Sequence, residues 1–434
     1  MKTLYPVAVA CLAMVARAAL AQEAVPQSLT LEQAHAIALK NHPGIAAADF
    51  RARAQSDVYR EARSGLLPQA NLYGSSVHAG AADTRIMAGG LNNPSVFSRS
   101  AYGVGITQLI TDFGRTYNLA ASARFQSDAE AANARATREQ VLLEVDRDFF
   151  GVLQAQALQN VARQTVETRQ LLFDRVNILA SNKLKSDLDV SFAKVALEDG
   201  KLLQQKAQND LDSAMAALSA ALGFSQSQQF TLVDRSPAAV EVTADVTPLL
   251  EQALHDRPEL ESLRASRDAA ERLARSVRDS RLPTLSAVIS AGDSPDHDAR
   301  LPNDYSAAGI QLSMPLFAGG YYTARQHEAK MRAKSAAETL RAAEDNVIRD
   351  VRVAWLNVTS ARDRLRTTQE LARSSEDAFR LADARYRVGS SSIVELSQAQ
   401  LQLTSAQIAE TTARYDVLMQ QAILDFQTGA PLGR

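Results

Sequence analysis

The stretch Leu66-Leu67-Pro68 has a counterpart in Arg281-Leu282-Pro283, and each follows an earlier proline, Pro43 or Pro258, at a distance of 25 residues. The residues before the earlier prolines are also alike, because Leu31-Glu32-Gln33-Ala34 corresponds to Leu250-Glu251-Gln252-Ala253. Similarity at a constant spacing is the sequence pattern of an internal repeat. The chain is therefore predicted to contain two copies of one structural plan.

The similarity continues beyond the paired prolines with a change in spacing. The offset between the copies is 215 residues at the prolines and 204–206 residues afterwards. One longer loop in the first copy explains this change, and its turn residues are Gly80, Gly89-Gly90 and Asn92-Asn93-Pro94. The later matches are Asp112-Phe113-Gly114 with Leu316-Phe317-Ala318-Gly319-Gly320, Ser186-Asp187-Leu188-Asp189-Val190 with Ser392-Ile393-Val394-Glu395-Leu396, and Gly223 with Gly429.

Each copy is expected to contain an opening helix, a β-hairpin, a very long helix, a tight reversal and a last helix. We expect a first repeat over 22–223, an equatorial linker over 224–246 and a second repeat over 247–434. In the first repeat the helices are predicted over 29–63, 114–181 and 186–222, with a hairpin over 69–110. In the second repeat the helices are predicted over 247–280, 319–387 and 392–427, with a hairpin over 284–314.

The two hairpins supply the four predicted strands, which cover 69–78, 101–110, 284–291 and 307–314. In the second strand Tyr102, Val104 and Ile106 fall on one face, whereas Gly103 and Gly105 fall on the other. Each strand has roughly the 9 to 11 residues that a tilted strand needs to cross a bilayer. The alternation is weak in each strand, as is usual for transmembrane barrels.

The last helix carries two heptad series of apolar residues on nearly opposite sides. One series is Val394, Leu401, Ile408, Tyr415 and Ala422, and the other is Leu396, Leu403, Val417 and Leu424, with Glu410 interrupting the second. The predicted long helices would each reach about 100 Å. Helices with two seams favour a curved wall, although a compact four-helix bundle is also compatible with this periodicity.

Four strands in one chain leave two unpaired sheet edges, which cannot face lipid. Pairing these edges between identical chains gives eight strands from two chains, which side chains nearly fill, or twelve from three chains, which leaves a lumen. A threefold assembly is therefore the smallest with a useful pore, and higher numbers stay open. The fold class predicted is mainly α with a small β part, an internally duplicated α-helical barrel whose four strands per chain contribute to a trimeric 12-stranded transmembrane β-barrel.

The N-terminus predicts secretion, because Lys2 precedes an apolar stretch from Leu4 to Val15 and an Ala19-Leu20-Ala21 cleavage site. Residues 1–21 are thus a predicted signal peptide, although Cys11 leaves a lipoprotein interpretation open. This cysteine is the only one in the chain, so no disulfide is expected. After residue 21 no apolar run approaches the roughly 20 residues of a spanning helix. The formal net charge of −2 argues against nucleic-acid binding.

The chain resembles the TolC-type outer-membrane efflux proteins over nearly all of its predicted mature length. The motifs are Leu66-Leu67-Pro68-Gln69, Met314-Pro315-Leu316-Phe317-Ala318-Gly319-Gly320, and Tyr386-Arg387-Val388-Gly389-Ser390 leading into Ile393-Val394-Glu395-Leu396-Ser397-Gln398-Ala399-Gln400. This resemblance implies a homotrimeric exit duct in the bacterial outer membrane with a helical barrel in the periplasm. It also implies a periplasmic adaptor (membrane fusion) protein and an inner-membrane pump of RND, ABC or MFS type as partners, and places 224–246 in a belt around the tunnel.

The resemblance further implies two kinds of site at the helix reversals. Adaptor docking falls on Val388, Gly389 and Ser390 and on the corresponding Asn182, Lys183 and Leu184, which depart from the Val-Gly-Leu type common in the family. We expect Gly389, and Asn182 in the first copy, to adopt the left-handed turn. The periplasmic gate falls on Asp189, Glu395, Gln398 and Tyr386. Gln398 stands where relatives commonly have a second acid, and Ser391 where some have an arginine.

The gate residues, and two further features of the sequence, also have a purely structural interpretation. An acid in a first helical turn, such as Asp189 or Glu395, commonly only stabilises the helix dipole. Tyr386 at a helix end is commonly a packing residue, Trp355 is expected in the core beside Val347, Val351, Ala354 and Val358, and Asp296-His297-Asp298 is expected to be a solvated loop.

Catalytic motifs are missing from the sequence: it has no G-x-S-x-G, phosphate-binding glycine loop, H-E-x-x-H or Cys-His pair. We therefore expect neither an enzyme nor a cofactor. The leading hypothesis is a passive exit duct of a tripartite efflux pump or type I secretion system. The alternative is a periplasmic coiled-coil adaptor or structural scaffold without membrane strands.

Overall fold

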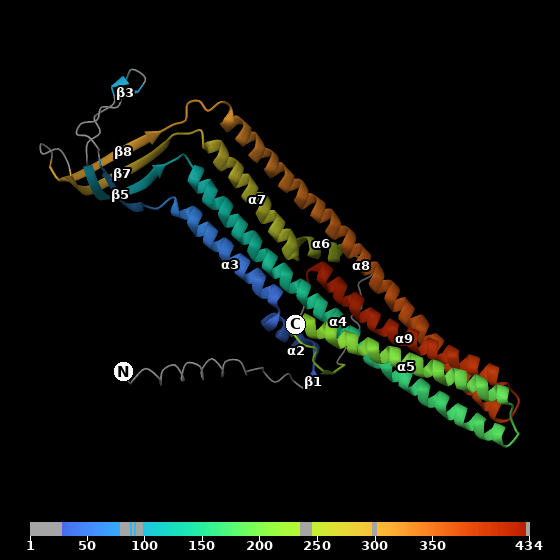
Figure 1. Cartoon of the computed structure of the whole chain (residues 1–434). Coiled ribbons are helices and arrows are strands. Elements are labelled where there is room, and N and C mark those ends of the chain that lie inside the picture. The colour runs from blue at the N-terminus through green and yellow to red at the C-terminus, as the bar shows by residue number, and fades with distance from the viewer. Residues whose placement is uncertain are drawn as a thin grey trace, which may run out of the picture.

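The computed structural model describes residues 28–78, 87–88, 91–92, 99–234, 245–296 and 302–430. The molecule is elongated, with a β-sheet at one end and the two helix reversals at the opposite end (Figure 1). The predicted signal peptide 1–21 with Cys11 lies outside the described residues. So do Gly80, Gly89-Gly90 and Asn93-Pro94 of the first hairpin loop, and His297-Asp298 of the second.

The opening segment of each repeat is two helices rather than the single helix predicted over 29–63 and over 247–280. Helix α2 (Leu31–Asn41) is followed by α3 (Pro43–Ser64), and α6 (Thr247–Asp256) by α7 (Pro258–Asp279). The break falls at His42 and Arg257, whose ψ angles of 120° and 122° are extended. Each precedes a proline, whose ring excludes the helical conformation from the residue before it.

The long helices end where the sequence predicts, to within two residues. Helices α4 (Arg115–Ser181) and α8 (Tyr321–Arg387) contain 67 residues each. They are followed by α5 (Asp187–Ala221) and α9 (Ile393–Thr428). In the part of the chain that the structure describes, no helix combines the length and apolar character needed to cross a membrane.

The helices form a wall, not a compact bundle. On the sheet side of the middle, α3 packs on α4, α4 on α7 and α7 on α8 (Figure 1). Toward the reversals, α5 packs on α4, α4 on α9 and α9 on α8. One edge of this wall is therefore made by α3 and α5, and the other by α8.

The sheet continues the same order. Its strands are β2 (Gln69–Val77), β5 (Arg99–Thr111), β7 (Thr284–Asp296) and β8 (Asp304–Ser313), all antiparallel and in the order β2-β5-β7-β8. Strand β7 runs five residues beyond the predicted end at Ala291, because its extension pairs with β8 and with the start of β5. The short strands β3 (Met87–Ala88) and β4 (Leu91–Asn92) pair with each other.

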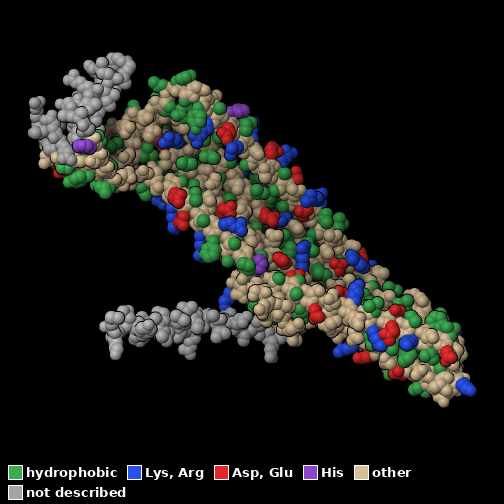
Figure 2. All heavy atoms as spheres, viewed as in Figure 1, with side chains coloured by type: hydrophobic (Ala, Val, Ile, Leu, Met, Phe, Trp, Pro, Cys, Tyr) green, Lys and Arg blue, Asp and Glu red, His purple; other side chains and the backbone are tan. Residues whose placement is uncertain are grey.

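The two faces of the sheet differ in polarity. One face, the apolar face, carries large exposed side chains at Leu72, Tyr102, Val104, Ile106, Ile289, Ile310 and Leu312. The other face, the polar face, has mostly small or uncharged polar residues, among them Asn71, Ser75, Thr107, Ser290 and Gln311. Lysines, arginines and acids become frequent only where the helices begin (Figure 2).

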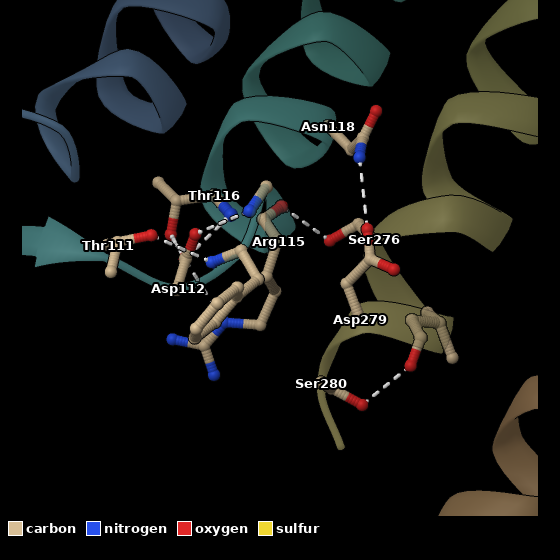
Figure 3. A network of polar contacts seen from close by, with 11 residues as sticks. Thr111, Asp112, Arg115, Thr116, Asn118, Ser276, Asp279 and Ser280 are labelled. Carbon is tan, nitrogen blue, oxygen red and sulfur yellow. Dashed lines mark hydrogen bonds and ion pairs between the residues drawn. The ribbon is translucent and has the colours of Figure 1, made fainter. Parts of the chain in front are cut away.

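Strand β5 passes into α4 through a side-chain cap (Figure 3). The buried Asp112 carboxylate accepts hydrogen bonds from the backbone amides of Gly114, at 3.2 Å, and Thr116, at 2.8 Å. These bonds satisfy amides that the first turn of a helix leaves unpaired. At the start of α8 in the second repeat, the Tyr321 amide donates instead to a backbone acceptor, the Ala318 carbonyl oxygen, at 3.0 Å.

The same junction is tied to the end of α7 (Figure 3). The Ser276 hydroxyl donates to the Arg115 carbonyl oxygen at 2.8 Å, and the Asn118 amide donates to the Asp279 carboxylate at 3.2 Å. These contacts join the two repeats where the sheet meets the helices.

Halfway along the molecule, β1 (Ser28–Leu29) pairs in parallel with β6 (Thr231–Leu232), which lies in the predicted equatorial linker. Residues 235–244 of that linker lie outside the described residues. Beside this pair the His35 Nε2 lies 2.5 Å from Asp146 Oδ1, and both side chains are buried. This contact joins α2 to α4 beside an apolar cluster that includes Leu29, Val145 and Leu232.

The two seams of α9 differ in burial along the helix. Leu396, Val417 and Leu424 of the second series are buried, whereas Val394 and Leu401 of the first series are about half exposed near the reversal. The predicted core residues Val347, Val351, Ala354 and Val358 are buried as expected. Trp355 is only partly buried, and it packs against Ala354, Val358 and Leu424.

Candidate functional site

The reversal after α4 places its left-handed residue one position later than predicted. Lys183 has a φ of +61°, whereas Asn182 has a φ of −92°. The Lys183 amide donates to the Ala180 carbonyl oxygen at 2.8 Å, and the Leu184 amide to that of Leu179 at 2.9 Å. This is a Schellman ending, in which the left-handed position normally favours glycine. The expectation for Asn182 was wrong, because hydrogen-bond geometry assigns that conformation to the following residue.

The reversal after α8 has the same geometry with glycine in the same place. Gly389 has a φ of +78°, and its amide donates to the Tyr386 carbonyl oxygen at 3.1 Å. The Ser390 amide donates to the Arg385 carbonyl oxygen at 2.9 Å. Lys183 and Gly389 are therefore equivalent residues of the two repeats, in agreement with the sequence correspondence.

The predicted docking residues form an exposed surface at the end of the wall. Leu184 and Val388 keep 69% and 79% of their surface exposed. The other four predicted docking residues, Asn182, Lys183, Gly389 and Ser390, are also exposed. A Cβ added at Gly389 would meet no atom within 4 Å. The two tips thus present apolar side chains that no element among the described residues covers.

The predicted gate acid Asp189 is held by a capping box. Its backbone amide donates to the Ser186 hydroxyl oxygen at 3.2 Å, while its carboxylate accepts from the Ser186 amide at 3.1 Å. The Ser186 hydroxyl also donates to this carboxylate, at 2.9 Å. The side chain therefore has a structural role at the start of α5.

The predicted gate acid Glu395 forms a small polar network. The Ser391 hydroxyl donates to its carboxylate at 2.7 Å, and the Arg385 guanidinium lies 3.1 Å from it. Its backbone amide donates to the hydroxyl of Ser392, the cap of α9. Gln398 is exposed on the next turn. Both acids are thus near the tips, each in a local contact of its own repeat.

Tyr386 is a packing residue with an electrostatic partner on the other reversal. Only 3% of its surface is exposed, and it packs with Leu172, Val176, Ala193, Ala382, Ile393 and Leu396. Burial raises the pKa of its hydroxyl, the negative charge of Asp189 raises it further, and Arg175 acts in the opposite direction. The Lys185 ammonium lies 4.4 Å from the centre of its ring. Tyr386 therefore lies within electrostatic range of Asp189, while Glu395 keeps its own partners.

Asp383 forms two ion pairs near the tips, and one of them joins the tip helices α4 and α8. Asp383 of α8 lies 3.5 Å from the Arg175 guanidinium of α4 and 2.5 Å from that of Arg387 on its own helix. The four-residue spacing of Asp383 and Arg387 is visible in the sequence, but nothing local indicates the partner on α4. A groove of about 160 Å³ borders these charges, and Gln400 lines it.

A sheet with one apolar face, continued by a wall of long helices that ends in two tight reversals, is the architecture of an outer-membrane channel subunit. The chain belongs to the Outer membrane efflux protein family, which matches residues 35–224 and 249–430, one range in each repeat. The protein is accordingly an outer-membrane protein whose helical part lies in the periplasm.

Known proteins agree with this assignment over most of the chain. The chain is 26% identical to the outer membrane protein TolC of Vibrio cholerae over 403 residues, 88% of this chain and 86% of that protein. It is 25% identical to the alkaline protease secretion protein AprF of Pseudomonas aeruginosa over 306 residues, 68% of this chain and 62% of that protein. A crystal structure of CusC superposes with a TM-score of 0.81 at 20% identity, covering 92% of each chain.

Proposed function

We propose that three copies of this chain form a passive exit duct through the outer membrane, with a 12-stranded barrel continued by a helical tunnel in the periplasm. The observation that supports it most is that sheet and helices are open along the same two edges. Strands β2 and β8 each pair on one side only within the described sheet. A long unpaired strand beside an apolar face requires a partner strand in lipid.

The two edges also carry exposed apolar side chains that a neighbouring chain would cover. On α5 they recur every three or four residues near the reversal, and on α8 they extend from the sheet junction toward the tip. The residues of the first edge are Leu184, Leu188, Phe192, Val195 and Leu202, and those of the second are Leu316, Phe317, Val353, Leu356, Leu371 and Leu381. Pairing the α8 edge of one chain with the α5 and β2 edge of the next closes a ring.

The tips are the proposed gate and docking surface. Asp189, Glu395 and Gln398, repeated by threefold symmetry, would put acidic rings at the end of the tunnel, where like charges attract cations. Tyr386, which contacts Lys185 of the other reversal, would keep the two reversals together in the closed state. The exposed Leu184 and Val388 would meet a periplasmic adaptor.

The energy for transport would come from an inner-membrane pump of RND, ABC or MFS type, because the duct itself only conducts. Support for efflux and secretion comes from the relatives, one of which is named for alkaline protease secretion. The alternative, a periplasmic scaffold without membrane strands, leaves the apolar face of the sheet unexplained.

Assembly is tested with the α8 edge, where Leu316 and Phe317 keep 89% and 91% of their surface exposed. Replacing both with Asn should reduce the trimer fraction in mild detergent about tenfold or more, since each protomer would lose two apolar side chains that trimer formation buries. The matched control is Leu119→Asn. Leu119 is also exposed, but its helix α4 lies within the wall and not at an edge. Native mass spectrometry of the membrane fraction measures the outcome. A wild-type protein that is soluble in the periplasm without detergent would contradict the duct proposal.

The gate is tested by charge neutralisation in planar bilayers. Asp189→Asn with Glu395→Gln keeps the size of both side chains and should weaken block of the single-channel current by divalent cations. Asp187→Asn, an exposed acid in the same turn as Asp189, is the matched control. Unaltered block in the double variant would remove these acids from the gate.

A further inference from the structure

Four residues in register form a row across the polar face of the sheet. Tyr73 of β2 pairs with Gly103 of β5, Gly103 with Gly292 of β7, and Gly292 with Tyr305 of β8. The two inner positions are glycines and the two edge positions are tyrosines. The Tyr305 hydroxyl hydrogen-bonds with Tyr73. The row thus joins the two open edges of the sheet through side chains that cross it.

The tyrosines occupy the space above the glycines. A Cβ added at Gly292 would lie 2.6 Å from Tyr305 Cζ, and one added at Gly105 would lie 2.9 Å from Tyr73 Cε1. Both rings therefore lie along the sheet rather than pointing away from it. A side chain at either glycine would displace a ring, so the glycines are needed for close approach.

The strand pairing is irregular at the same place on the sheet. The pairing of β5 with β7 shifts register between Ser100 and Tyr102, next to the row. A β-bulge of this kind increases the local twist and bends the strand. A Cβ added at Gly103 would lie 2.6 Å from the Ala291 carbonyl oxygen, so the backbones of β5 and β7 also approach closely here.

Curvature explains how the edge residues can meet. In a flat sheet the α-carbons of Tyr73 and Tyr305 would be about 14 Å apart, three strand spacings, which is close to the full reach of two tyrosines laid end to end. Bending the sheet toward the polar face shortens the span on that face. A four-stranded third of a closed barrel must turn by about 120°, and deliberate curvature of this kind relies on bulges and glycines.

From this geometry we infer that Tyr73 and Tyr305 form a strap that bends the sheet over Gly103 and Gly292 and fixes the curvature with which β2 and β8 meet neighbouring chains. The assembly consequence rests on the proposed function, because it requires edge pairing between copies. The bend itself is a property of the single chain. The two parts can therefore be tested separately.

The bend is measured by the distance between spin labels on the edge strands. Ser76 of β2 and Ser306 of β8 are exposed and face away from the strap. Cysteines at these two positions would be the labelling sites in a chain whose Cys11 is replaced. Trimers diluted with unlabelled protein report the distance within one protomer. Tyr73→Ala with Tyr305→Ala should lengthen and broaden this distance.

Assembly is measured as the rate of trimer formation on refolding into lipid vesicles. Tyr73→Phe or Tyr305→Phe keeps the ring and removes the hydrogen bond, and each should slow the rate about fivefold, the factor that one net hydrogen bond supplies. The double Phe variant should be no slower than either single variant, since all three lose the same bond. Tyr102→Phe, on the apolar face beside Gly103, is the matched control.

An unchanged label distance in the double Ala variant, with wild-type rates in all Phe variants, would overturn the strap. A wild-type chain that does not form trimers would instead contradict the proposed function. The label distance in that chain would still test the bend.

Discussion

The Lys185 ammonium lies 4.4 Å from the centre of the Tyr386 ring. This contact joins the residues between α4 and α5 to the last turn of α8, and it places a cation on a buried aromatic side chain. The Tyr386 hydroxyl has no hydrogen-bond partner among the described residues, so the ring and not the hydroxyl makes the observed connection. The two reversals are thus linked by an aromatic contact and by the Arg175–Asp383 ion pair.

The first prediction separates the ring of Tyr386 from its hydroxyl. Tyr386→Phe should leave the stability and the closed-state current nearly unchanged. Tyr386→Ala should remove about 3 to 5 kcal/mol by leaving a cavity and should raise the closed-state leak. Single-channel recording with urea unfolding of the same samples measures both. A leak that appears already in Tyr386→Phe would instead assign the latch to the hydroxyl.

The second prediction concerns the left-handed residue of each reversal. Lys183→Gly should relieve about 1 kcal/mol of backbone strain, because a side chain is disfavoured at positive φ. Hydrogen exchange at the Leu184 amide, which is bonded to the Leu179 carbonyl oxygen, should slow about fivefold. Gly389→Lys is the reciprocal control and should accelerate exchange at Ser390. Exchange rates in both variants that equal those of the wild-type protein would contradict this assignment.

The third prediction concerns the cap at the sheet junction. Asp112→Ala should cost about 1 to 2 kcal/mol, because the Gly114 and Thr116 amides would lose their acceptor. Asp112→Asn keeps one acceptor oxygen and should cost less. Thermal unfolding followed by circular dichroism compares the three proteins. A loss in Asp112→Asn as large as in Asp112→Ala would mean that the charge, rather than the cap, stabilises the junction.

Much of the fold could be predicted because the residues that end its helices and strands act locally in the sequence. Prolines, glycines and capping residues mark the ends of elements, so the predicted 114–181 helix agrees with α4 to one residue. Strand β7 was predicted too short because Asp293-Ser294-Pro295-Asp296 has the composition of a turn. Its pairing depends on neighbours instead, including the Ser294 amide, which donates to the Asn303 carbonyl oxygen at 2.7 Å.

The site was less predictable because its contacts join distant segments. Arg175 and Asp383 are 208 positions apart in the chain, and the Lys185 ammonium contacts the Tyr386 ring of the other reversal. No spacing rule relates such residues, and only the packing of α4 against the second repeat brings them together. The positive φ of Lys183 was missed for another reason, since residue type favours Asn182 but the Schellman hydrogen bonds select the next position.

The last prediction is a pH dependence that arises in α4. Burial raises the pKa of Asp148 to about 6, the nearby Glu144 raises it as well, and Arg147 opposes them. The ordinary pKa of an aspartate is 3.8, so between about pH 4 and pH 6 the folded chain binds a proton that the unfolded chain has lost. Stability should therefore fall as the pH rises through this window, the reverse of a carboxylate stabilised by an ion pair.

Asp148→Asn removes the carboxyl group that binds this proton. The dependence of stability on pH should therefore flatten between pH 4 and pH 6, and the variant should be more stable than wild type at pH 7. Glu144→Gln is the matched control: it keeps Asp148 but removes the repulsion, so the midpoint of the dependence should move to lower pH without disappearing. Urea unfolding of the solubilised protein at a series of pH values gives both slopes. A wild-type slope in Asp148→Asn would show that other carboxylates determine the dependence, because Asp148 would then be ionised in the folded chain throughout the window.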